Sequence, residues 1–167
     1  MSFCLKSNSK GFTLIELVVT VAIVAILASV AMPMLQLTVQ RVKESELRAN
    51  LRQIRDAIDA YKKAVDEGKI VKSIEQSGYP PSLEVLVDGV VDVKDPSKHM
   101  IKFLRRIPID PMSSPDKNAN GYGNVEHRWG LRSYVSQASN PTEGEDVFDV
   151  YSLSQQVGIN GIPYSQW

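Results

Sequence analysis

Residues 10–17 read Lys-Gly-Phe-Thr-Leu-Ile-Glu-Leu, and they open an apolar run that continues to Leu35. From Leu17 to Leu35 there are nineteen residues without a charged side chain. As an α-helix rising about 1.5 Å per residue, this run reaches roughly 28 Å, close to the ~30 Å hydrocarbon core of a bilayer. The sequence therefore predicts one membrane-spanning helix near the amino terminus.

Glu16 places a carboxylate inside the apolar edge of this run. An acid at mid-bilayer costs about 2.5 to 3.5 kcal/mol on insertion scales, and less near the helix end. In the first turn of a helix, the helix dipole stabilises an acid by only about 0.3 to 1 kcal/mol. The shortfall predicts a partner that neutralises Glu16. The alternative is that its side chain reaches the lipid headgroups.

The string from Gly11 to Glu16 follows a short leader with Lys6 and Lys10 and precedes an apolar helix that contains Pro33. This arrangement resembles the prepilin signal of type IV pilins and type II secretion pseudopilins. The resemblance implies that a prepilin peptidase cleaves between Gly11 and Phe12 and methylates the new amine of Phe12. It also implies that the Phe12 amine of a neighbouring subunit neutralises Glu16 as the subunit enters a filament.

A secretory signal peptide is the competing interpretation of the same region. Ser29-Val30-Ala31 fits a small-x-small cleavage pattern and would leave a mature chain that begins at Met32. Glu16 interrupts such an apolar core, and the string from Gly11 to Glu16 is far more specific than a triplet. We therefore expect the mature chain to keep its apolar helix.

Composition limits the remaining possibilities. The chain has 167 residues, of which nineteen are basic and nineteen acidic, so its overall charge gives no indication of nucleic-acid binding. About 130 residues lie beyond the span, enough for one modest domain. The only cysteine, Cys4, lies in the expected leader, so the mature chain would have no thiol or disulfide.

Two rules predict opposite orientations of the chain in the membrane. Five basic residues follow the span within twenty positions and two precede it, which by the positive-inside count favours a cytoplasmic carboxyl-terminal domain. A prepilin leader is instead read by a peptidase that faces the cytoplasm. We follow the motif and expect a single-pass inner-membrane protein whose amino terminus is cytoplasmic and whose carboxyl-terminal domain is periplasmic.

Beyond the span the apolar positions thin into a stripe with spacings of 4, 3, 4, 3 and 4. It consists of Leu47, Leu51, Ile54, Ile58, Tyr61 and Val65. These spacings predict one buried face of a helix that continues to about Glu67, with Gly68 suited to the left-handed position after it. A coiled coil is the alternative, but three turns followed by a compact domain favour packing onto the chain's own sheet.

Pro33 interrupts the helix and lacks the amide that a helical bond requires, so a kink or a locally unwound turn is expected there. In the family that the sequence resembles, the equivalent proline is where the helix loosens during filament packing. A plain membrane-helix proline, tolerated by its surroundings, is the alternative.

The rest of the chain predicts a small α/β domain. Residues 82–87 resemble a short helix that ends near Gly89, residues 90–100 a surface loop, and residues 103–111 an extended segment. Residues 112–123 have the composition of a loop, while 128–135 and 146–153 are strand candidates. Tyr164 and Trp167 suggest a tail tucked against the domain.

We therefore expect an α+β type IV pilin fold, in which a long amino-terminal helix packs on a small carboxyl-terminal antiparallel sheet. The expected divisions are a cleaved leader over 1–11, a membrane and assembly helix over 12–37, an amphipathic helix over 38–67 and a periplasmic domain over 68–167.

Catalysis has little support in the sequence. His99 and His127 are the only histidines, and neither stands beside a nucleophile, phosphate-loop or zinc-protease motif. Asp56 and Asp59 lie on a face of the helix that is expected to be solvated. The sequence favours a protein that is not an enzyme.

Several later motifs, in order, resemble the major pseudopilin of type II secretion. They are Tyr79-Pro80, Leu83 and Leu86, Ile107 to Pro111, Trp129-Gly130 and Asp149 to Leu153. That resemblance implies calcium in the loop after residue 153, yet residues 154–167 contain no Asp or Glu. Because a hard cation prefers carboxylate oxygens, we expect no cofactor, and a calcium ion in this loop, as the resemblance implies, is the alternative. Residues 112–128 form an insertion relative to the family pattern.

The expected function is that of a structural subunit of a type II secretion pseudopilus. Its expected partners are the prepilin peptidase, identical subunits, minor pseudopilins and an inner-membrane assembly platform. A type IV pilus or competence pilin is the first alternative, and a membrane-anchored periplasmic binding domain that never polymerises is the second.

Overall fold

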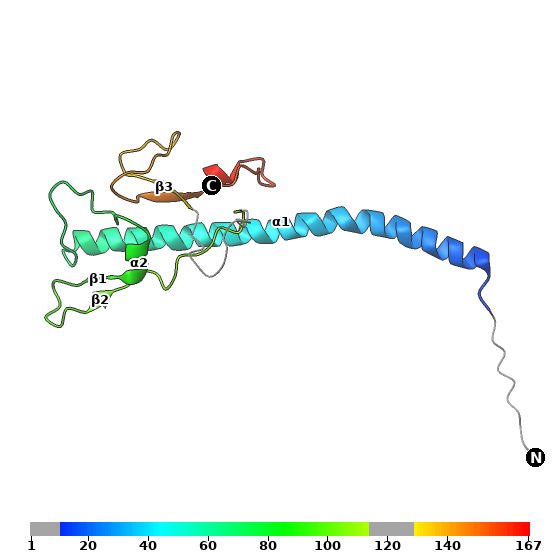
Figure 1. Cartoon of the computed structure of the whole chain (residues 1–167), viewed down its shortest axis with the longest axis horizontal. Coiled ribbons are helices and arrows are strands. Elements are labelled where there is room, and N and C mark those ends of the chain that lie inside the picture. Colours follow the sequence, from blue (N-terminus) through cyan, green and yellow to red (C-terminus); the bar gives the residue numbers. More distant parts are fainter. Residues whose placement is uncertain (1–10, 114–128) are drawn as a thin grey trace, which may run out of the picture. The chain divides into compact units, whose positions relative to one another are not determined.

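The computed structural model describes residues 11–113 and 129–167, except for the side chains of residues 30–33. The elements in order are α1 (Leu14–Asp66), α2 (Glu84–Asp88), β1 (Val90–Val91), β2 (Met100–Ile101), β3 (Trp129–Arg132), β4 (Asp149–Ser152) and the 3-10 helix η1 (Tyr164–Gln166), as Figure 1 shows. The chain divides into two compact units, Met1–Gln40 and Arg41–Trp167. The long helix and the antiparallel strands confirm the expected α+β fold.

Helix α1 begins and ends with specific backbone caps. At its start, the backbone N–H of Thr13 donates to Glu16 Oε2 at 2.9 Å, and the N–H of Glu16 donates to Thr13 Oγ1 at 3.3 Å. This reciprocal pair is a capping box. At its end, Gly68 has a φ of 70° and Lys69 N–H donates to Ala64 O, which is the Schellman arrangement. The helix therefore starts two residues later than Phe12 and ends where Gly68 predicted.

The predicted stripe of α1 is buried, as expected. Each of its six side chains is at most 8% exposed. The same core contains Leu83 and Leu86 from the α2 region, Leu104 and Ile107 from the extended segment, and Trp129, Val147, Val150 and Tyr164 from the last third of the chain. The stripe thus packs within its own domain rather than in a coiled coil, and it contacts more than the sheet.

The sheet differs from the expectation in one respect. Strands β3 and β4 pair antiparallel with Gly130 opposite Tyr151, inside the two ranges predicted as strands. Residues 90–100 were expected as a loop, but β1 and β2 form a second antiparallel pair there, in which Val90 lies opposite Ile101. Two residues per strand are too few to give an alternating pattern, so the sequence offered no signal for this hairpin.

Three of the late sequence motifs meet in this domain. The indole Nε1 of Trp129 donates to Pro108 O at 2.9 Å, and Ser152 Oγ donates to the buried Asp110 Oδ2 at 2.6 Å. The ring of Tyr151 lies across Gly130, where an added Cβ would come within 2.3 Å of it. The extended segment and both strands of the β3–β4 pair are therefore held together through these residues.

Candidate processing and assembly site

The predicted cleavage site lies just before α1. Gly11 and Phe12 are in neither helix nor strand, and Phe12 is 88% exposed. A Cβ built on Gly11 would meet no atom within 4 Å. The segment is thus accessible to an enzyme, while cleavage at Gly11 and methylation of Phe12 stay predictions.

Glu16 lies in the first turn of α1, as predicted, and its carboxylate already has a partner there. Thr13 donates to Glu16 Oε2 from its hydroxyl at 2.8 Å and from its backbone N–H. Sequence reasoning weighed only the charge of Glu16 and missed this cap. The spacing Thr-x-x-Glu before an apolar run was the signal that could have revealed it.

The side chains described in the apolar part of α1 are exposed within the described part of the chain. The large apolar side chains described between Leu14 and Leu27 are each about half exposed or more. By length and composition this helix can cross a membrane. Pro33 lies inside the bounds of α1. A kink at Pro33, and its role in assembly, stay predictions.

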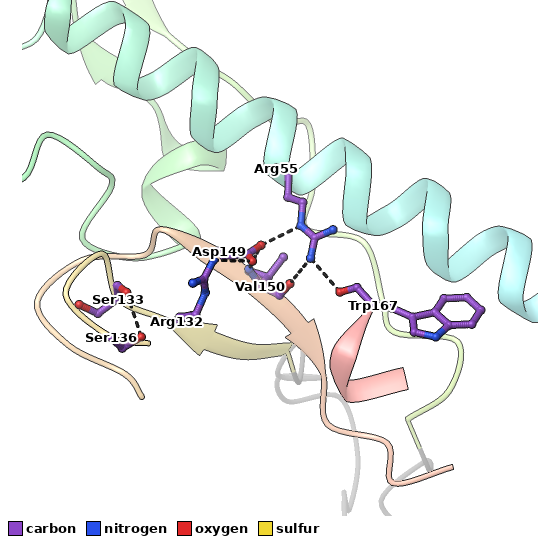
Figure 2. Close-up of polar contacts among 7 residues, drawn as sticks. All are labelled: Arg55, Arg132, Ser133, Ser136, Asp149, Val150 and Trp167. Atoms are coloured by element: carbon purple, nitrogen blue, oxygen red, sulfur yellow. Dashed lines mark hydrogen bonds and ion pairs between the residues drawn. The ribbon is translucent and has the colours of Figure 1, made fainter. Parts of the chain in front are cut away.

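At the carboxyl end of the domain, Arg55 of α1 joins three segments (Figure 2). Its Nε donates to Asp149 Oδ1 at 2.7 Å, and its Nη2 donates to Val150 O at 3.1 Å and to Trp167 O at 2.9 Å. Arg132 Nη2 donates to Asp149 Oδ2 at 3.0 Å. We call Arg55, Arg132, Asp149 and the oxygen of Trp167 the arginine clamp.

A second anchor ties the tail to α1 one turn before the stripe begins. Glu44 is only 7% exposed, and its Oε1 accepts from Tyr164 Oη at 3.0 Å and from Ile159 N–H at 2.8 Å. Glu44 continues the stripe spacing, three residues before Leu47, so the sequence did carry a signal that this acid would be buried. The tail is tucked, as Tyr164 and Trp167 predicted.

The acids that precede the tail already have protein partners. Asp149 is shared by two guanidinium groups, and Asp146 accepts from Ser77 Oγ and from the backbone N–H of Tyr134 at 2.9 Å. Residues 154–167 offer no carboxylate side chain. Among residues 11–113 and 129–167, no three His, Cys, Asp or Glu side chains gather as a metal-binding group.

His99 contacts an acid four residues before it in the chain. His99 Nδ1 lies 2.5 Å from Asp95 Oδ2, and this hydrogen bond holds the pKa of Asp95 below its ordinary value. His127 and most of the insertion lie outside the described residues. Asp56 and Asp59 are exposed, as expected.

Comparisons with known proteins agree with the amino-terminal motif. The model of the prokaryotic N-terminal methylation motif matches residues 6–32. A type IV major fimbrial protein FimA of Dichelobacter nodosus is 43% identical over 65 residues, which is 39% of this chain and 42% of that protein. The chain thus spans less than half the length of this fimbrial relative.

A second group of relatives matches further along the chain. The type II secretion system core protein G of Pseudomonas aeruginosa is 27% identical over 114 residues, covering 66% of this chain and 72% of that protein. The protein of the same name from Aeromonas hydrophila is 25% identical over the same shares. No solved structure matches the chain.

By their names, these relatives are a major protein of type IV fimbriae and a core protein of type II secretion systems. The apolar helix and the similarity to core protein G indicate anchoring in the inner membrane. With its methylation motif, its long helix and its small antiparallel sheets, the chain resembles the type IV pilins and pseudopilins, and the comparisons support a structural subunit of that type.

Proposed function

We propose that the chain is the major, filament-forming subunit of a type II secretion pseudopilus. The observation that carries this proposal is the reach of the similarity to core protein G, 114 residues against 65 for the fimbrial protein. A match of 114 residues extends beyond the amino-terminal motif, which pilins and pseudopilins share. No catalytic step is assigned to the chain.

In this proposal a prepilin peptidase removes residues 1–11 and methylates Phe12. The carboxyl-terminal domain then stands on the periplasmic side. Identical subunits, minor pseudopilins and an inner-membrane assembly platform are the proposed partners. Apolar packing of residues 17–35 among neighbouring subunits supplies most of the association free energy, through the many van der Waals contacts of closely packed helices.

We further propose that no calcium ion holds the carboxyl-terminal tail. The arginine clamp and the Glu44 anchor connect the tail to α1. In this proposal these protein contacts hold the tail in place of a bound cation. This proposal is supported by the engagement of Asp149 with Arg55 and Arg132.

Deletion of the gene in its own host tests the proposed function directly. Loss of exported proteins from the medium, with surface pili retained, is the expected result. Loss of pili with secretion retained would replace the proposal by its first alternative, a type IV pilus or competence pilin, which the 43% identity to the fimbrial protein favours.

Crosslinking separates both filament proposals from a membrane-anchored binding domain. The only native cysteine is Cys4, so a single cysteine introduced at Leu27 in the processed chain reports contacts between neighbours without background. A ladder of crosslinked multimers is expected. If only monomers are seen, and the deletion strain has normal secretion and pili, the result would favour the membrane-anchored binding domain that never polymerises.

Orientation and processing are tested separately. A periplasm-dependent reporter fused after Trp167 is expected to be active, and activity of a cytoplasm-dependent reporter alone would contradict the proposed topology. Sequencing of the mature amino terminus is expected to give methylated Phe12 rather than Met32.

A further inference from the structure

One surface of the unit Arg41–Trp167 combines exposed cations of α1 with exposed apolar side chains of the tail. Its members are Arg41, Arg48, Arg52, Val157, Ile159 and Ile162, all of them exposed. We call it the basic–apolar surface. The three apolar side chains are 52%, 43% and 44% exposed, respectively.

Contacts along the tail bring these residues together. The Arg48 guanidinium lies 4.3 Å from the centre of the Trp167 ring. Arg48, Arg52 and Ile162 line one hollow of about 300 Å³. Ile159 is placed by its backbone bond to Glu44. Arg41 precedes Arg48 by seven residues, two helical turns, and therefore lies on the same face of α1.

The tail presents its apolar side chains from a braced loop. Gly158 N–H donates to Ile162 O at 2.9 Å, and Ile162 N–H donates to Asn160 Oδ1 at 3.1 Å. Gly158 lies beneath Trp167, where an added Cβ would come within 2.6 Å of the indole. The exposure of Val157, Ile159 and Ile162 is thus built into the fold.

Two acids near these cations already have partners of their own. Glu44 is buried and bonded to the tail, and Asp149 is shared by Arg55 and Arg132. Among the described residues, no acid lines the hollow between α1 and the tail. Arg41 and Arg52 are exposed to solvent.

We propose that the basic–apolar surface docks the domain on the anionic phospholipid surface of the membrane that holds α1. Exposed apolar side chains surrounded by Arg or Lys are the chemistry of an interfacial contact, and guanidinium groups bind phosphate oxygens in two-point geometry. Arg41 follows Leu35 by six residues in the sequence, so the chain itself keeps the first arginine within about 20 Å of the end of the span. This inference requires membrane anchoring but not filament formation.

Single chains in lipid nanodiscs provide the test. The full chain with Cys4→Ser and Ile162→Cys carries a fluorophore at 162, and a nitroxide-headgroup lipid is the quencher. The matched control is Ile74→Cys, at a fully exposed position that lies beyond the end of α1. Discs of phosphatidylcholine alone are compared with discs containing phosphatidylglycerol.

Quenching at 162 but not at 74, and only with phosphatidylglycerol, is the expected result. Arg41→Gln and Arg52→Gln are each expected to reduce the docked-to-undocked ratio about fivefold. Lys98→Gln and Lys102→Gln, exposed cations of the β1–β2 region, serve as controls and should change nothing. The emission of buried Trp129 reports that each variant is folded.

Three outcomes would overturn the proposal. Equal quenching at both labelled positions would mean that no surface is preferred. Loss of quenching on addition of inorganic phosphate, with no dependence on anionic lipid, would assign the arginines to a soluble anion. If the label at 162 is shielded from the quencher only in discs that hold two chains, the surface belongs to a contact with a second copy.

Discussion

At the amino end of α1, Glu16 is both the acid of a capping box and a carboxylate in an apolar helix. The cap stabilises the first turn through Thr13, whereas assembly is proposed to depend on the negative charge. Replacement by Ala removes both properties, so that variant alone cannot tell them apart. Gln retains the hydrogen-bonding capacity of a capping box and removes only the charge.

Glu16→Gln and Glu16→Ala are both expected to be cleaved at Gly11 and to lose most crosslinked multimers, because each lacks the charge. Thr13→Ala removes the cap alone, at a cost of about 1 kcal/mol to the helix, and should still assemble. The readouts are mature amino-terminal sequence and the crosslinking ladder. Normal multimers from Glu16→Gln would remove the proposed role of the charge.

The requirement for glycine at position 130 comes from a side chain on the paired strand. The Tyr151 ring occupies the space of the missing Cβ. Gly130→Ala is therefore expected to destabilise the domain by about 1 to 3 kcal/mol, the usual cost of overpacking. Urea unfolding of the full chain measures it. The double variant Gly130→Ala/Tyr151→Ala, which lacks the clash, should lose less than the sum of the single changes, and strict additivity would contradict this account.

At the scale of elements, α1 acts as the common surface on which the rest of the domain closes. Its apolar stripe is buried by segments from 70 to 164, while its polar side supplies Arg55 to the arginine clamp. The basic residues after the span also clarify the conflict with the positive-inside count. Arg55 and Arg48 have contacts within the folded domain, so their presence is explained without reference to topology.

Asp149→Asn tests the clamp. It leaves Arg55 and Arg132 beside each other without their shared anion, so the free energy of unfolding should fall by about 1 to 2 kcal/mol. The loss should shrink at high salt, which screens partly exposed charges. Glu145→Gln, an exposed acid in the connection before β4, is the matched control. Equal unfolding midpoints for the two variants would show that the clamp contributes nothing.

At the scale of the whole molecule, the carboxyl-terminal tail decides how the domain is closed. The Glu44 anchor and the Arg55 contacts of the arginine clamp connect residues that are 94 to 120 positions apart in sequence. Both anchors consist of protein groups alone. The domain should therefore keep its closed tail whatever the calcium concentration.

Calcium addition or chelation is expected to leave the unfolding temperature of the full chain unchanged, because a ligand that does not bind the folded state cannot stabilise it. Differential scanning calorimetry of the full chain, in millimolar calcium and in excess chelator, measures the unfolding temperature. Magnesium controls for general ionic effects. A calcium-specific rise of several degrees would show that a site exists and would contradict the proposed metal-free closure.

Local patterns in the sequence determined the membrane-length helix, the buried stripe, the end of α1 at Gly68, the two main strands and the tucked tail. They did so because helix and strand periodicities, apolar length and cap residues act over a few neighbouring positions. The tertiary structure alone decided which charges meet, as in Arg55 with Asp149, why residue 130 is glycine, and that Val90–Val91 pairs with Met100–Ile101. These features depend on groups brought together by packing of the core, and no short-range pattern in the chain encodes such distant contacts.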